Sequence, residues 1–598
     1  MVLLGGEVGD DTPAGTLRDS TLIEHLEFSA EAGGDATAFT FVDYASDPDG
    51  ARFTLTRTQL RTRVRAVAAQ LQQVARPGDR AAVLAGQGSD YVVGFLAAVH
   101  AGLIAVPLFA PDQPGQSDRL DATLADCAPS VVVTGTADAA AVRAYLDDPA
   151  GVLPARPRLV AVDAVPDELA DAWHDPGCTG DDVAYLQYTS GSTRVPAGVV
   201  ITHRAAACNA GQLAMAYDLE PGRSAGVSWL PLFHDMGLVL FLLLPVVLGL
   251  PSTIMAPSAF VRRPQRWLQL LAETPGAYTA APDFAYQLCV RRARPADLAT
   301  LRLEGVHVLV NGAEPVRSAT IAAFHETFGP CGLPVGAHRP SYGLAEATVF
   351  VTAAPLRDEP RLVTVDRDEL GAGEVVSCSP EHPRALVIAS CGRPVGQQVV
   401  VVDPGTGRAL DEHRVGEIWV CGPNVGIGYW RKPEESAAVF GARLAEPAPA
   451  GAPPGPWLRT GDLGAVQGGE LFITGRLKDL IIVDGRNHYP QDVEGTVADA
   501  HPSIRRDYVA AFSVAEPGGP EGLVVVAECA PAPADAAQRD AITGAVRRAI
   551  AERHGVSLRD LVLGAVGSVA RTSSGKLARR ATRQRYLDAA STLMEVSA

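Results

Sequence analysis

The first third of the chain alternates short apolar runs with stretches in which apolar residues recur at helical spacing. Runs of four or five apolar residues predict buried strands, and the spacing i, i+3, i+4 predicts amphipathic helices. The expected strands are 80–84, 104–108, 130–134 and 158–162, and the expected helices are 54–74, 91–100, 118–126 and 138–146. Strands that alternate with helices indicate βαβ units and a mainly parallel α/β sheet.

The pattern changes in the second half of the chain. Apolar strands at 397–402 and 416–421 are separated by turn residues, which predicts a β-rich subdomain over about 390–475. A compositional break near 475–479 follows. Beyond it the pattern predicts a smaller α/β unit with strands at 508–514 and 522–528 and a helix at 534–553. The 598 residues exceed a single hydrophobic core, so we expect at least two domains.

Residues 236–261 carry no charge and raise the question of a membrane span. A run of about 20 apolar residues is long enough to cross a bilayer. Pro245, Pro251 and Pro257 divide this run, however, so it is better explained by a buried helix followed by a buried strand at 252–256. We therefore expect no membrane insertion.

Charge and cysteine usage narrow the class of protein. The formal net charge of −17 argues against sequence-independent binding to nucleic acid, which requires basic side chains to neutralise phosphates. It also argues against a general affinity for anionic membranes. The nine cysteines include no C-x-x-C pair, and the amino terminus lacks a secretion signal. These features favour a cytoplasmic protein with reduced thiols.

A run of small residues, Thr189-Ser190-Gly191-Ser192-Thr193, follows the apolar strand 183–188 and leads into another at 199–202. Small residues let the backbone turn tightly and bring N–H groups and hydroxyls close to a phosphate. The run is not a Walker A loop, because it lacks G-x-x-x-x-G-K-[ST]. Taken alone, such a run is more often a surface turn; its position after a buried strand favours phosphate binding.

Three further stretches carry candidate chemistry. His234 and Asp235 stand immediately before the apolar run, an arrangement that suits a pocket for a charged head group with an apolar tail, although a buried histidine is usually a core residue. Tyr342 offers a ring for stacking on a base, and Glu346 offers a hard oxygen ligand for Mg²⁺. In isolation Glu346 would be read as a solvated carboxylate. Asp462 lies in a turn where its carboxylate can accept two ribose hydroxyls.

Lysine usage singles out a site near the carboxyl terminus. Of the 51 basic residues only three are lysine, namely Lys432, Lys478 and Lys576. A chain that uses arginine wherever a positive charge suffices is expected to keep lysine where a compact ammonium is needed. A basic loop around Lys576 would otherwise be read as a solvated tail.

These stretches, over roughly 180–580, resemble the motifs of the adenylate-forming ligases, which join a carboxylate to AMP. Two motifs resemble those of one branch, the fatty acyl-AMP ligases, including the long-chain enzymes of mycolic acid assembly. They are Ser-Thr-Arg-x-Pro-Ala-Gly at 192–198 and Asp-Gly-Arg-Asn-His-Tyr-Pro-Gln-Asp at 484–492. Most of the superfamily has Gly and Lys where this chain has Arg194 and Ala197. Asp283 is a second departure, because the family pattern has Asn there.

The resemblance implies the adenylate-forming fold, with a large domain over 1–475, a hinge at 476–480 and a small mobile α+β domain over 481–598. It implies ATP and Mg²⁺ as cofactors. The implied catalytic residues are Lys576, His234 and Glu346, with Glu346 and Thr193 at the metal and Lys478 and Asp479 at the hinge. The implied nucleotide contacts are Thr189, Ser190, Gly191, Ser192, Thr193, Gly312, Ala313, Glu314, Pro315, Ser341, Tyr342, Gly343, Asp462 and Arg476. The implied acyl pocket contains Trp229, Phe233, Asp235, Met236, Gly237 and Phe284.

The resemblance also implies that a fatty acid is first converted to acyl-AMP and then transferred to the phosphopantetheine thiol of an acyl carrier protein, or of a carrier domain of a polyketide or peptide synthase. The carrier is favoured over CoA by about 35 residues at 356–390, where CoA ligases have fewer; in the family a similar insertion impedes rotation of the small domain. Three alternatives remain: an acyl-CoA ligase, an amino-acid-activating domain, and a non-catalytic nucleotide-binding scaffold.

Overall fold

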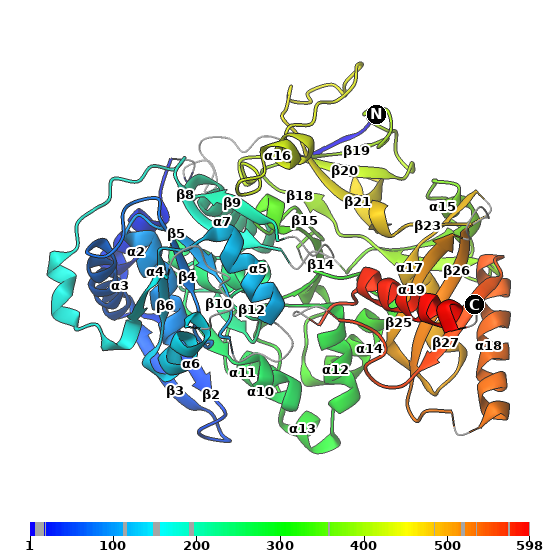
Figure 1. The fold of residues 1–598 in the computed structure, drawn as a ribbon, viewed down its shortest axis with the longest axis horizontal. Helices are drawn as coiled ribbons and strands as arrows, with labels where there is room; N and C mark the ends of the chain where they lie inside the picture. Colours follow the sequence, from blue (N-terminus) through cyan, green and yellow to red (C-terminus); the bar gives the residue numbers. More distant parts are fainter. Residues whose placement is uncertain are drawn as a thin grey trace.

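The computed structural model describes residues 1–5, 17, 19–111, 117–147, 156–189, 196–356, 359–483, 485–515, 521–533, 535–571 and 575–596. Two large sheets and the helices packed on them form the amino-terminal two thirds of the fold, and a smaller group of strands and helices follows (Figure 1). This arrangement confirms the expected α/β class. We refer to the described residues before 476 as the large domain and those of 481–596 as the small domain.

The first large sheet has six strands in the order β7-β6-β4-β5-β8-β9, and only the last pair is antiparallel. Its strands are β4 (Arg80–Val83), β5 (Ile104–Pro107), β6 (Val131–Thr134), β7 (Arg158–Ala161), β8 (Val183–Tyr188) and β9 (Gly198–Thr202). The helices between them are α4 (Ser89–His100), α5 (Ser117–Cys127) and α6 (Thr136–Leu146). The alternating pattern therefore predicted this sheet to within about two residues at most boundaries.

One predicted boundary was wrong. The helix expected over 54–74 is α3 (Arg57–Gln72), and the residues before it form the strand β3 (Ala51–Thr56). Thr56 is the N-cap of α3: its hydroxyl accepts the N–H of Gln59, and the Gln59 side chain accepts the N–H of Thr56. This capping box fixes the start of the helix, so the apolar spacing that extends further back belongs to a strand.

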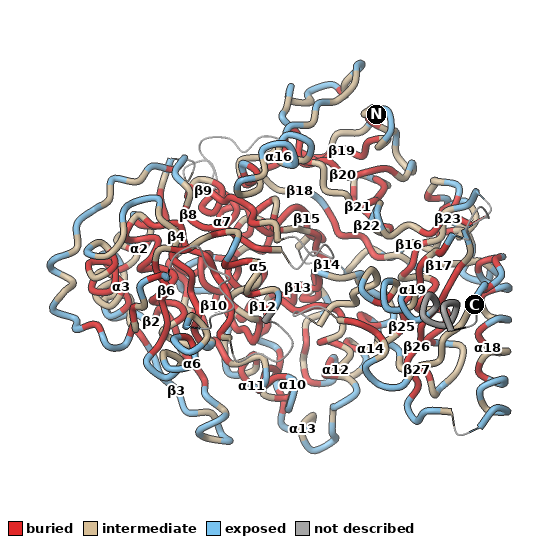
Figure 2. Tube along the Cα trace, in the orientation of Figure 1, coloured by how far each residue is buried: buried red, intermediate tan, exposed pale blue. Residues whose placement is uncertain are grey.

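The second large sheet has nine strands in the order β18-β15-β14-β13-β12-β10-β11-β2-β3 and is parallel through its centre. Its other strands are β2 (Thr37–Asp43), β10 (Ala225–Ser228), β11 (Ser252–Met255), β12 (Ala277–Ala281), β13 (Val306–Asn311), β14 (His338–Tyr342), β15 (Thr352–Ala353) and β18 (Arg393–Pro394). Its helices are α2 (Leu22–Gly33), α7 (His203–Tyr217), α10 (Pro257–Arg262), α11 (Gln265–Ala272), α12 (Asp283–Arg292), α13 (Pro295–Thr300) and α14 (Ser318–Phe328). Residues of both large sheets share one continuous hydrophobic core (Figure 2).

The uncharged run forms a buried helix and a buried strand, as expected. The helix consists of α8 (Asp235–Leu238), a π-helical segment (Val239–Leu243) and α9 (Leu244–Leu248), and the strand is β11. Pro245 cannot donate a backbone N–H, so the helix carbonyls one turn before it lack that donor. The Ser252 hydroxyl donates to the carbonyl of Phe241 at 3.0 Å, and the Tyr278 hydroxyl donates to the carbonyl of Leu240 at 3.2 Å. The irregular segment is thus bonded to the sheet beside it.

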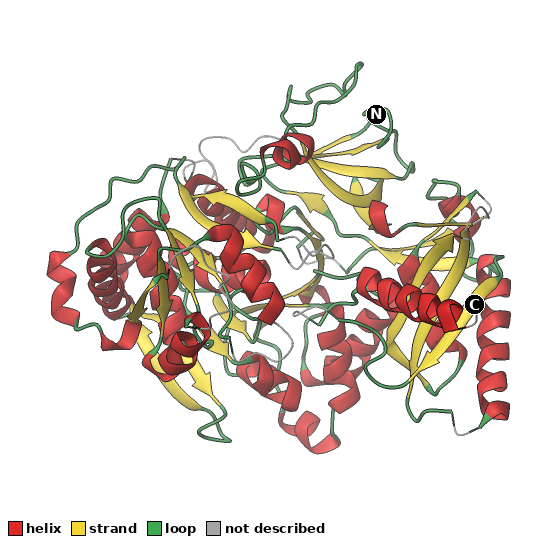
Figure 3. Ribbon diagram, in the orientation of Figure 1, coloured by secondary structure: helices red, strands yellow, loops and turns green. Residues whose placement is uncertain are grey.

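The β-rich part is an antiparallel sheet of five strands in the order β1-β19-β20-β21-β22. It contains β19 (Gln398–Val402), β20 (Gly416–Cys421), β21 (Leu458–Gln467) and β22 (Glu470–Arg476), with helix α16 (Pro433–Phe440) nearby. The expected strands at 397–402 and 416–421 are confirmed. The amino-terminal strand β1 (Leu3–Gly5), which the sequence did not predict, completes its edge (Figure 3).

The small domain has its own hydrophobic core beneath a sheet of three strands. Its elements are β23 (Ile481–Val483), β24 (Arg486–His488), α17 (Pro490–Ala500), β25 (Ile504–Ala515), β26 (Glu521–Cys529), α18 (Ala536–His554), β27 (Leu558–Gly564) and α19 (Arg579–Val596). Both strands and the helix expected here are confirmed.

The residues expected to form an insertion fold into a two-stranded sheet, β16 (Leu362–Asp366) and β17 (Ala385–Ala389), with the short helix α15 (Arg367–Gly371). A separate apolar cluster joins Val365 and Leu370 of this segment to Leu463 of the large domain and to Tyr489 of the small domain. The segment is therefore packed between the two domains. It is not a solvated loop.

Candidate active site

Tyr342 and Asp462 meet where two sheets converge. Tyr342 ends β14, and its hydroxyl donates to Oδ2 of Asp462 at 2.8 Å; both side chains are buried. Arg476, the last residue of β22, donates from Nε to Oδ1 of Asp462 at 3.1 Å. Three of the residues expected to contact the nucleotide are thus brought together from strands far apart in the sequence.

Asp462 lies within β21, at an irregularity in its pairing with β20, and not in the turn that the sequence predicted. Glu417, which sequence reasoning missed, holds this part of the strand. Its buried carboxylate on β20 accepts two hydrogen bonds from the Arg459 guanidinium at 3.0 and 2.7 Å and one from the N–H of Gly461 at 3.2 Å. Both Arg459 hydrogen bonds go to Oε2 and the Gly461 N–H donates to Oε1, so both carboxylate oxygens are engaged and the orientation of Glu417 is fixed. The signal available in the sequence was a glutamate inside an otherwise apolar strand.

Glu346 lies beside Tyr429, whose hydroxyl donates to its Oε1 at 2.8 Å. Burial raises the pKa of Glu346, and the hydrogen bond from Tyr429 opposes that rise. Within the part of the chain that the structure describes, no three or more His, Cys, Asp or Glu side chains form a metal site. A single carboxylate suits Mg²⁺ that is bound mainly through substrate phosphates, because Mg²⁺ commonly takes one or two protein carboxylates there. The sequence did not predict a role for Tyr429.

The loops around Tyr342 pack so closely that two positions require glycine. A Cβ on Gly312 would lie 2.7 Å from the carbonyl oxygen of Ser341, and one on Gly343 would lie 1.6 Å from that of Val349. Ala313 has a φ of 64°, an uncommon conformation for a residue with a side chain. The Ser341 hydroxyl forms a hydrogen bond of 2.8 Å with the Tyr217 hydroxyl, so this side chain is engaged in the core.

Asp283, the departure noted in the sequence, anchors this region. Its buried carboxylate accepts hydrogen bonds from Asn311, from the N–H of Arg317 and from the Thr320 hydroxyl, at 3.2, 3.1 and 2.8 Å. Nearby, Glu314 accepts the N–H of Phe284 at 2.7 Å. Burial raises the pKa of Glu314 to about 7, with the charge of Asp283 adding to the rise. Pro315, next to Glu314, is exposed.

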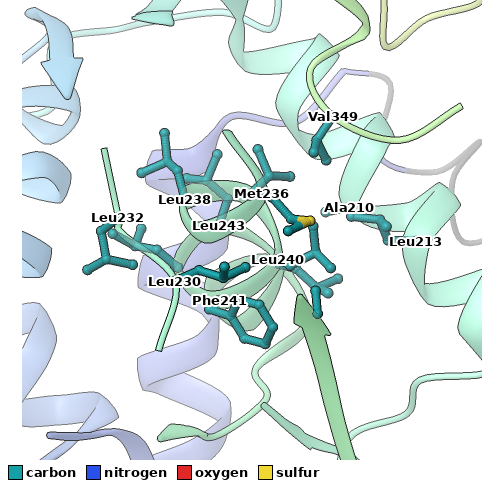
Figure 4. Close-up of a cluster of buried hydrophobic side chains, with 14 of the residues drawn as sticks. Ala210, Leu213, Leu230, Leu232, Met236, Leu238, Leu240, Phe241, Leu243 and Val349 are labelled. Carbon is teal, nitrogen blue, oxygen red and sulfur yellow. The ribbon is translucent and has the colours of Figure 1, made fainter. Parts of the chain in front are cut away.

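The expected acyl pocket is a wall of apolar side chains beside a polar pair. Trp229 stacks on Phe260 with ring centroids 4.0 Å apart and meets Phe284 edge-on at 6.2 Å. Phe233 contacts Phe109 at 5.3 Å. Met236 begins the helical wall that continues through Leu238, Leu240 and Leu243 (Figure 4). A Cβ on Gly237 would lie 2.2 Å from the carbonyl oxygen of Pro231, so this turn also requires glycine.

Nδ1 of His234 contacts Oδ1 of Asp235 beside these apolar side chains, and the contact is an ion pair when His234 is protonated. Burial opposes ionisation of Asp235, but the neighbouring His234, with a contribution from Lys576, lowers the pKa of Asp235 to about 2. The pair therefore presents a fixed carboxylate at physiological pH.

Lys576 reaches this junction from the small domain. Burial lowers the pKa of Lys576, while the charges of Asp235, Glu314 and Asp462 oppose that effect. Lys576 thus lies within electrostatic range both of Asp235 on the apolar side and of Asp462 on the nucleotide side.

The remaining predicted residues are less central. Lys478 is exposed, and Asp479 forms an ion pair of 3.3 Å with Arg579. Thr189 donates its N–H to the carbonyl of Ala197 at 3.4 Å, and Lys432 donates to the carbonyl of Pro196. Ser190, Gly191, Ser192 and Thr193 lie outside the described residues.

No helix among the described residues is long and apolar enough to cross a membrane. Two family models match the chain: AMP-binding enzyme over 26–430, and the AMP domain of Disco-interacting protein 2-like proteins over 478–596.

Named relatives match nearly the whole chain. The long-chain-fatty-acid–AMP ligase FadD32 of Mycolicibacterium smegmatis is 46% identical over 95% of this chain and 94% of its own. The 4-hydroxyphenylalkanoate adenylyltransferase of Mycobacterium tuberculosis is 40% identical over 96% of this chain and 92% of its own.

Solved structures agree in fold. One from a study of fatty acyl-adenylate ligases of E. coli and L. pneumophila superposes with a TM-score of 0.82 at 33% identity, covering 96% of this chain and 98% of its own. The L. pneumophila enzyme in complex with acyl adenylate and pyrophosphate gives 0.72 at 30% identity, covering 95% and 96%.

Proposed function

The chain belongs to the fatty acyl-AMP ligases of the AMP-binding enzyme family, and from this we propose that it activates a medium- or long-chain fatty acid with ATP, releases pyrophosphate, and passes the acyl group to a carrier protein. One observation carries the proposal. Lys576 lies in range of Asp235 beside the apolar wall and of Asp462 beside Tyr342, so a carboxylate and a nucleotide can be held on either side of one ammonium.

The negative charges of the carboxylate and of ATP determine what the site must do. In adenylation a carboxylate oxygen attacks the α-phosphorus of ATP, a P–O bond forms, and the bond to pyrophosphate breaks. Both reactants are anionic, so the protein must offset their repulsion and align them. We assign Lys576 to bridge the carboxylate and the α-phosphate, and His234 to organise the junction with the acyl pocket.

We assign the binding of the nucleotide to the other residues of the site. Tyr342 stacks on adenine, Asp462 accepts the ribose hydroxyls, and Arg476 lies beside it. Residues 189–193 cradle the β- and γ-phosphates. Mg²⁺ bound with ATP would be held by Glu346 and Thr193 and would neutralise phosphate charge.

The second step is thioester formation. The phosphopantetheine thiol of an acyl carrier protein, or of a carrier domain, attacks the acyl-AMP carbonyl, and AMP leaves with the electrons of the broken C–O bond. In this proposal the small domain turns about Lys478 and Asp479 between the two steps. The packing of 356–390 between the domains favours a carrier over free CoA, because a carrier can offset the cost of that movement with its own docking surface. We place the reaction in the cytoplasm.

Other functions fit the site less well. An amino-acid-activating domain needs a carboxylate for the substrate ammonium within a smaller pocket. Asp235 is engaged by His234, and the wall behind it is apolar. A non-catalytic scaffold has no use for a half-buried lysine within electrostatic range of Asp235 and Asp462. An acyl-CoA ligase differs only in its thiol acceptor.

The test is a product analysis by mass spectrometry. Purified protein is mixed with ATP, Mg²⁺ and a panel of fatty acids and amino acids, with CoA or a phosphopantetheinylated carrier protein as acceptor. We expect acyl-AMP and pyrophosphate from fatty acids, acyl-carrier in the presence of the carrier, and negligible acyl-CoA. Activation of amino acids without fatty acids would falsify the adenylation proposal. Efficient acyl-CoA synthesis would leave adenylation standing and replace the acceptor.

A further inference from the structure

Asp507 joins the small domain to the large one. It lies in β25, and its side chain is 12% exposed. Oδ1 accepts a hydrogen bond from the Arg317 guanidinium at 3.0 Å, and Oδ2 forms an ion pair of 3.4 Å with Arg291. Arg291 is on α12, and Arg317 is the residue that precedes α14, so both arginines belong to the large domain.

The backbone of the same residue holds the segment that carries Lys576. The Arg571 guanidinium donates to the carbonyl of Asp507 and also to the carbonyl of Gly575, the neighbour of Lys576. Arg571 lies over the ring of Tyr508, 4.0 Å from its centroid. An isolated bridge pairs Arg571 with Leu577 on the other side of Lys576. Asp507 is thus linked through its side chain to the large domain and through its backbone to the lysine segment.

A second support of this segment lies within the small domain, apart from the ion pair of Arg579 with Asp479 of the hinge. Arg579 donates to Glu494 at 2.6 and 2.8 Å, and both residues belong to the small domain. The contact of Arg579 with Glu494 is therefore kept when the small domain moves relative to the large one. The contact of Asp507 with Arg317 and Arg291 exists only when the small domain lies as it does here. Burial raises the pKa of Asp507, but the arginines, Arg317 foremost, lower it overall, so the carboxylate is charged.

We propose that Asp507 is a positioning residue for adenylation, which fixes Lys576 over the reacting groups by pairing with Arg317 and Arg291. The inference rests on the proposed function, in which Lys576 acts in the first step and the small domain moves for the second. A misplacement of about 1 Å in a catalytic group can cost about 100-fold in rate. Loss of the pairing therefore impairs acyl-AMP formation and spares thioester formation from acyl-AMP that is already made.

The experiment measures the two half-reactions separately in Asp507→Asn. Pyrophosphate release from ATP and fatty acid reports adenylation, and transfer from synthetic acyl-AMP to holo-carrier reports the second step. We expect kcat for adenylation to fall about 10- to 100-fold, with the KM for ATP changed by less than about threefold, and transfer to stay within about twofold. Asp507→Glu, which keeps the charge, should recover much of the adenylation rate.

Matched variants separate positioning from a general loss of structure. Arg506→Gln removes a neighbouring exposed charge that pairs with Asp499 inside the small domain, and it should leave both half-reactions unchanged. Arg317→Gln combined with Asp507→Asn should lose little more than either single variant, because both remove the same contact. If Asp507→Asn does not fold, Arg291→Gln tests the same contact, because it removes an exposed partner of Asp507 on the large domain.

Equal losses in both half-reactions, or full adenylation in Asp507→Asn, would overturn the inference. Absence of acyl-AMP in the unaltered protein would instead contradict the proposed function. The two failures are therefore distinguishable.

Discussion

Arg367 and Asp492 form a bidentate ion pair, with Nε to Oδ2 at 2.8 Å and Nη2 to Oδ1 at 3.0 Å. Arg367 begins α15 in the 356–390 segment, and Asp492 lies in the first turn of α17 in the small domain. Each side chain is only 12% exposed. The Tyr489 hydroxyl adds a hydrogen bond of 3.3 Å to the carbonyl of Leu370. The segment therefore contacts the small domain through specific polar bonds as well as apolar packing.

We predict that Arg367→Gln lets acyl-CoA form. Removing one partner of a largely buried ion pair costs about 3–5 kcal/mol, which weakens the observed arrangement of the domains relative to others. Adenylation should fall by less than about threefold, while acyl-CoA, measured by mass spectrometry with CoA as acceptor, should rise above the level of the unaltered protein. Arg414→Gln, which breaks an exposed pair with Glu374, is the control and should form none. A folded Arg367→Gln protein without acyl-CoA would show that this pair does not restrain the small domain.

Lys576→Ala should abolish most adenylation. The ammonium offsets charge that is shared by the attacking carboxylate and the α-phosphate, and removing one such preorganised contact costs about 100- to 1,000-fold in kcat. Binding of ATP, measured by calorimetry, should weaken much less. Lys576→Arg should also be poor, because its guanidinium is larger and forked. Near-normal pyrophosphate release by Lys576→Arg would contradict both the assignment and the argument from lysine usage.

Tyr429→Phe should shift the dependence of adenylation on pH and Mg²⁺. Glu346 must be deprotonated to hold Mg²⁺; burial raises its pKa, and the Tyr429 hydroxyl lowers it. Loss of the hydroxyl raises the pKa further, so the acidic limb of the rate profile at limiting Mg²⁺ should move to higher pH. A hydrogen bond to a charged group contributes about 1.5 kcal/mol, which corresponds to about a tenfold higher Mg²⁺ requirement. An unchanged acidic limb would argue against Glu346 as the metal ligand.

Glu314→Gln should change how stability depends on pH. The folded pKa of Glu314 is raised by burial from 4.5 to about 7, so the folded state binds the proton more tightly than the unfolded state. The contribution of Glu314 to the free energy of unfolding is fully present below pH 4.5 and is lost as the pH rises to about 7. The variant should lack this loss and melt higher than the unaltered protein at pH 8, with nearly equal melting points at pH 4.5. Identical pH profiles would show that Glu314 is ionised like an exposed residue.

Local sequence patterns predicted elements and motif residues well, because both depend on neighbours in the chain. The strands expected at 80–84 and 130–134 are apolar runs bounded by polar or small residues, and they match β4 and β6 to within one residue at each end. Short strands in which small residues outnumber large apolar ones, such as β10 (Ala-Gly-Val-Ser) and β12 (Ala-Tyr-Thr-Ala-Ala), carry no such signal. The three residues of β1 gain their conformation from pairing with β19 and were also not predicted.

Pairings between distant residues could not be predicted. Tyr429 and Glu346 are separated by 83 positions, and Arg317 and Asp507 by 190. Their partnership depends on how sheets and domains pack, which periodicity does not encode. Resemblance to a family implied that Glu346, Asp462 and Lys576 belong to one site, and this assignment stays a prediction. The groups that hold them, including Glu417 and Tyr429, became visible only in the structure.

The π-helical segment at Val239–Leu243 offers a way to redesign the acyl pocket without altering its chemistry. A π turn accommodates one residue more than an α turn, and each α-helical residue turns the chain by about 100°. Deleting one residue there would rotate the later side chains of the helix about its axis relative to Met236. The Ser252 and Tyr278 hydroxyls would then lose the carbonyls to which they donate. The preferred length of the fatty acid could then be reset by the length of one helix, with His234 and Lys576 left in place.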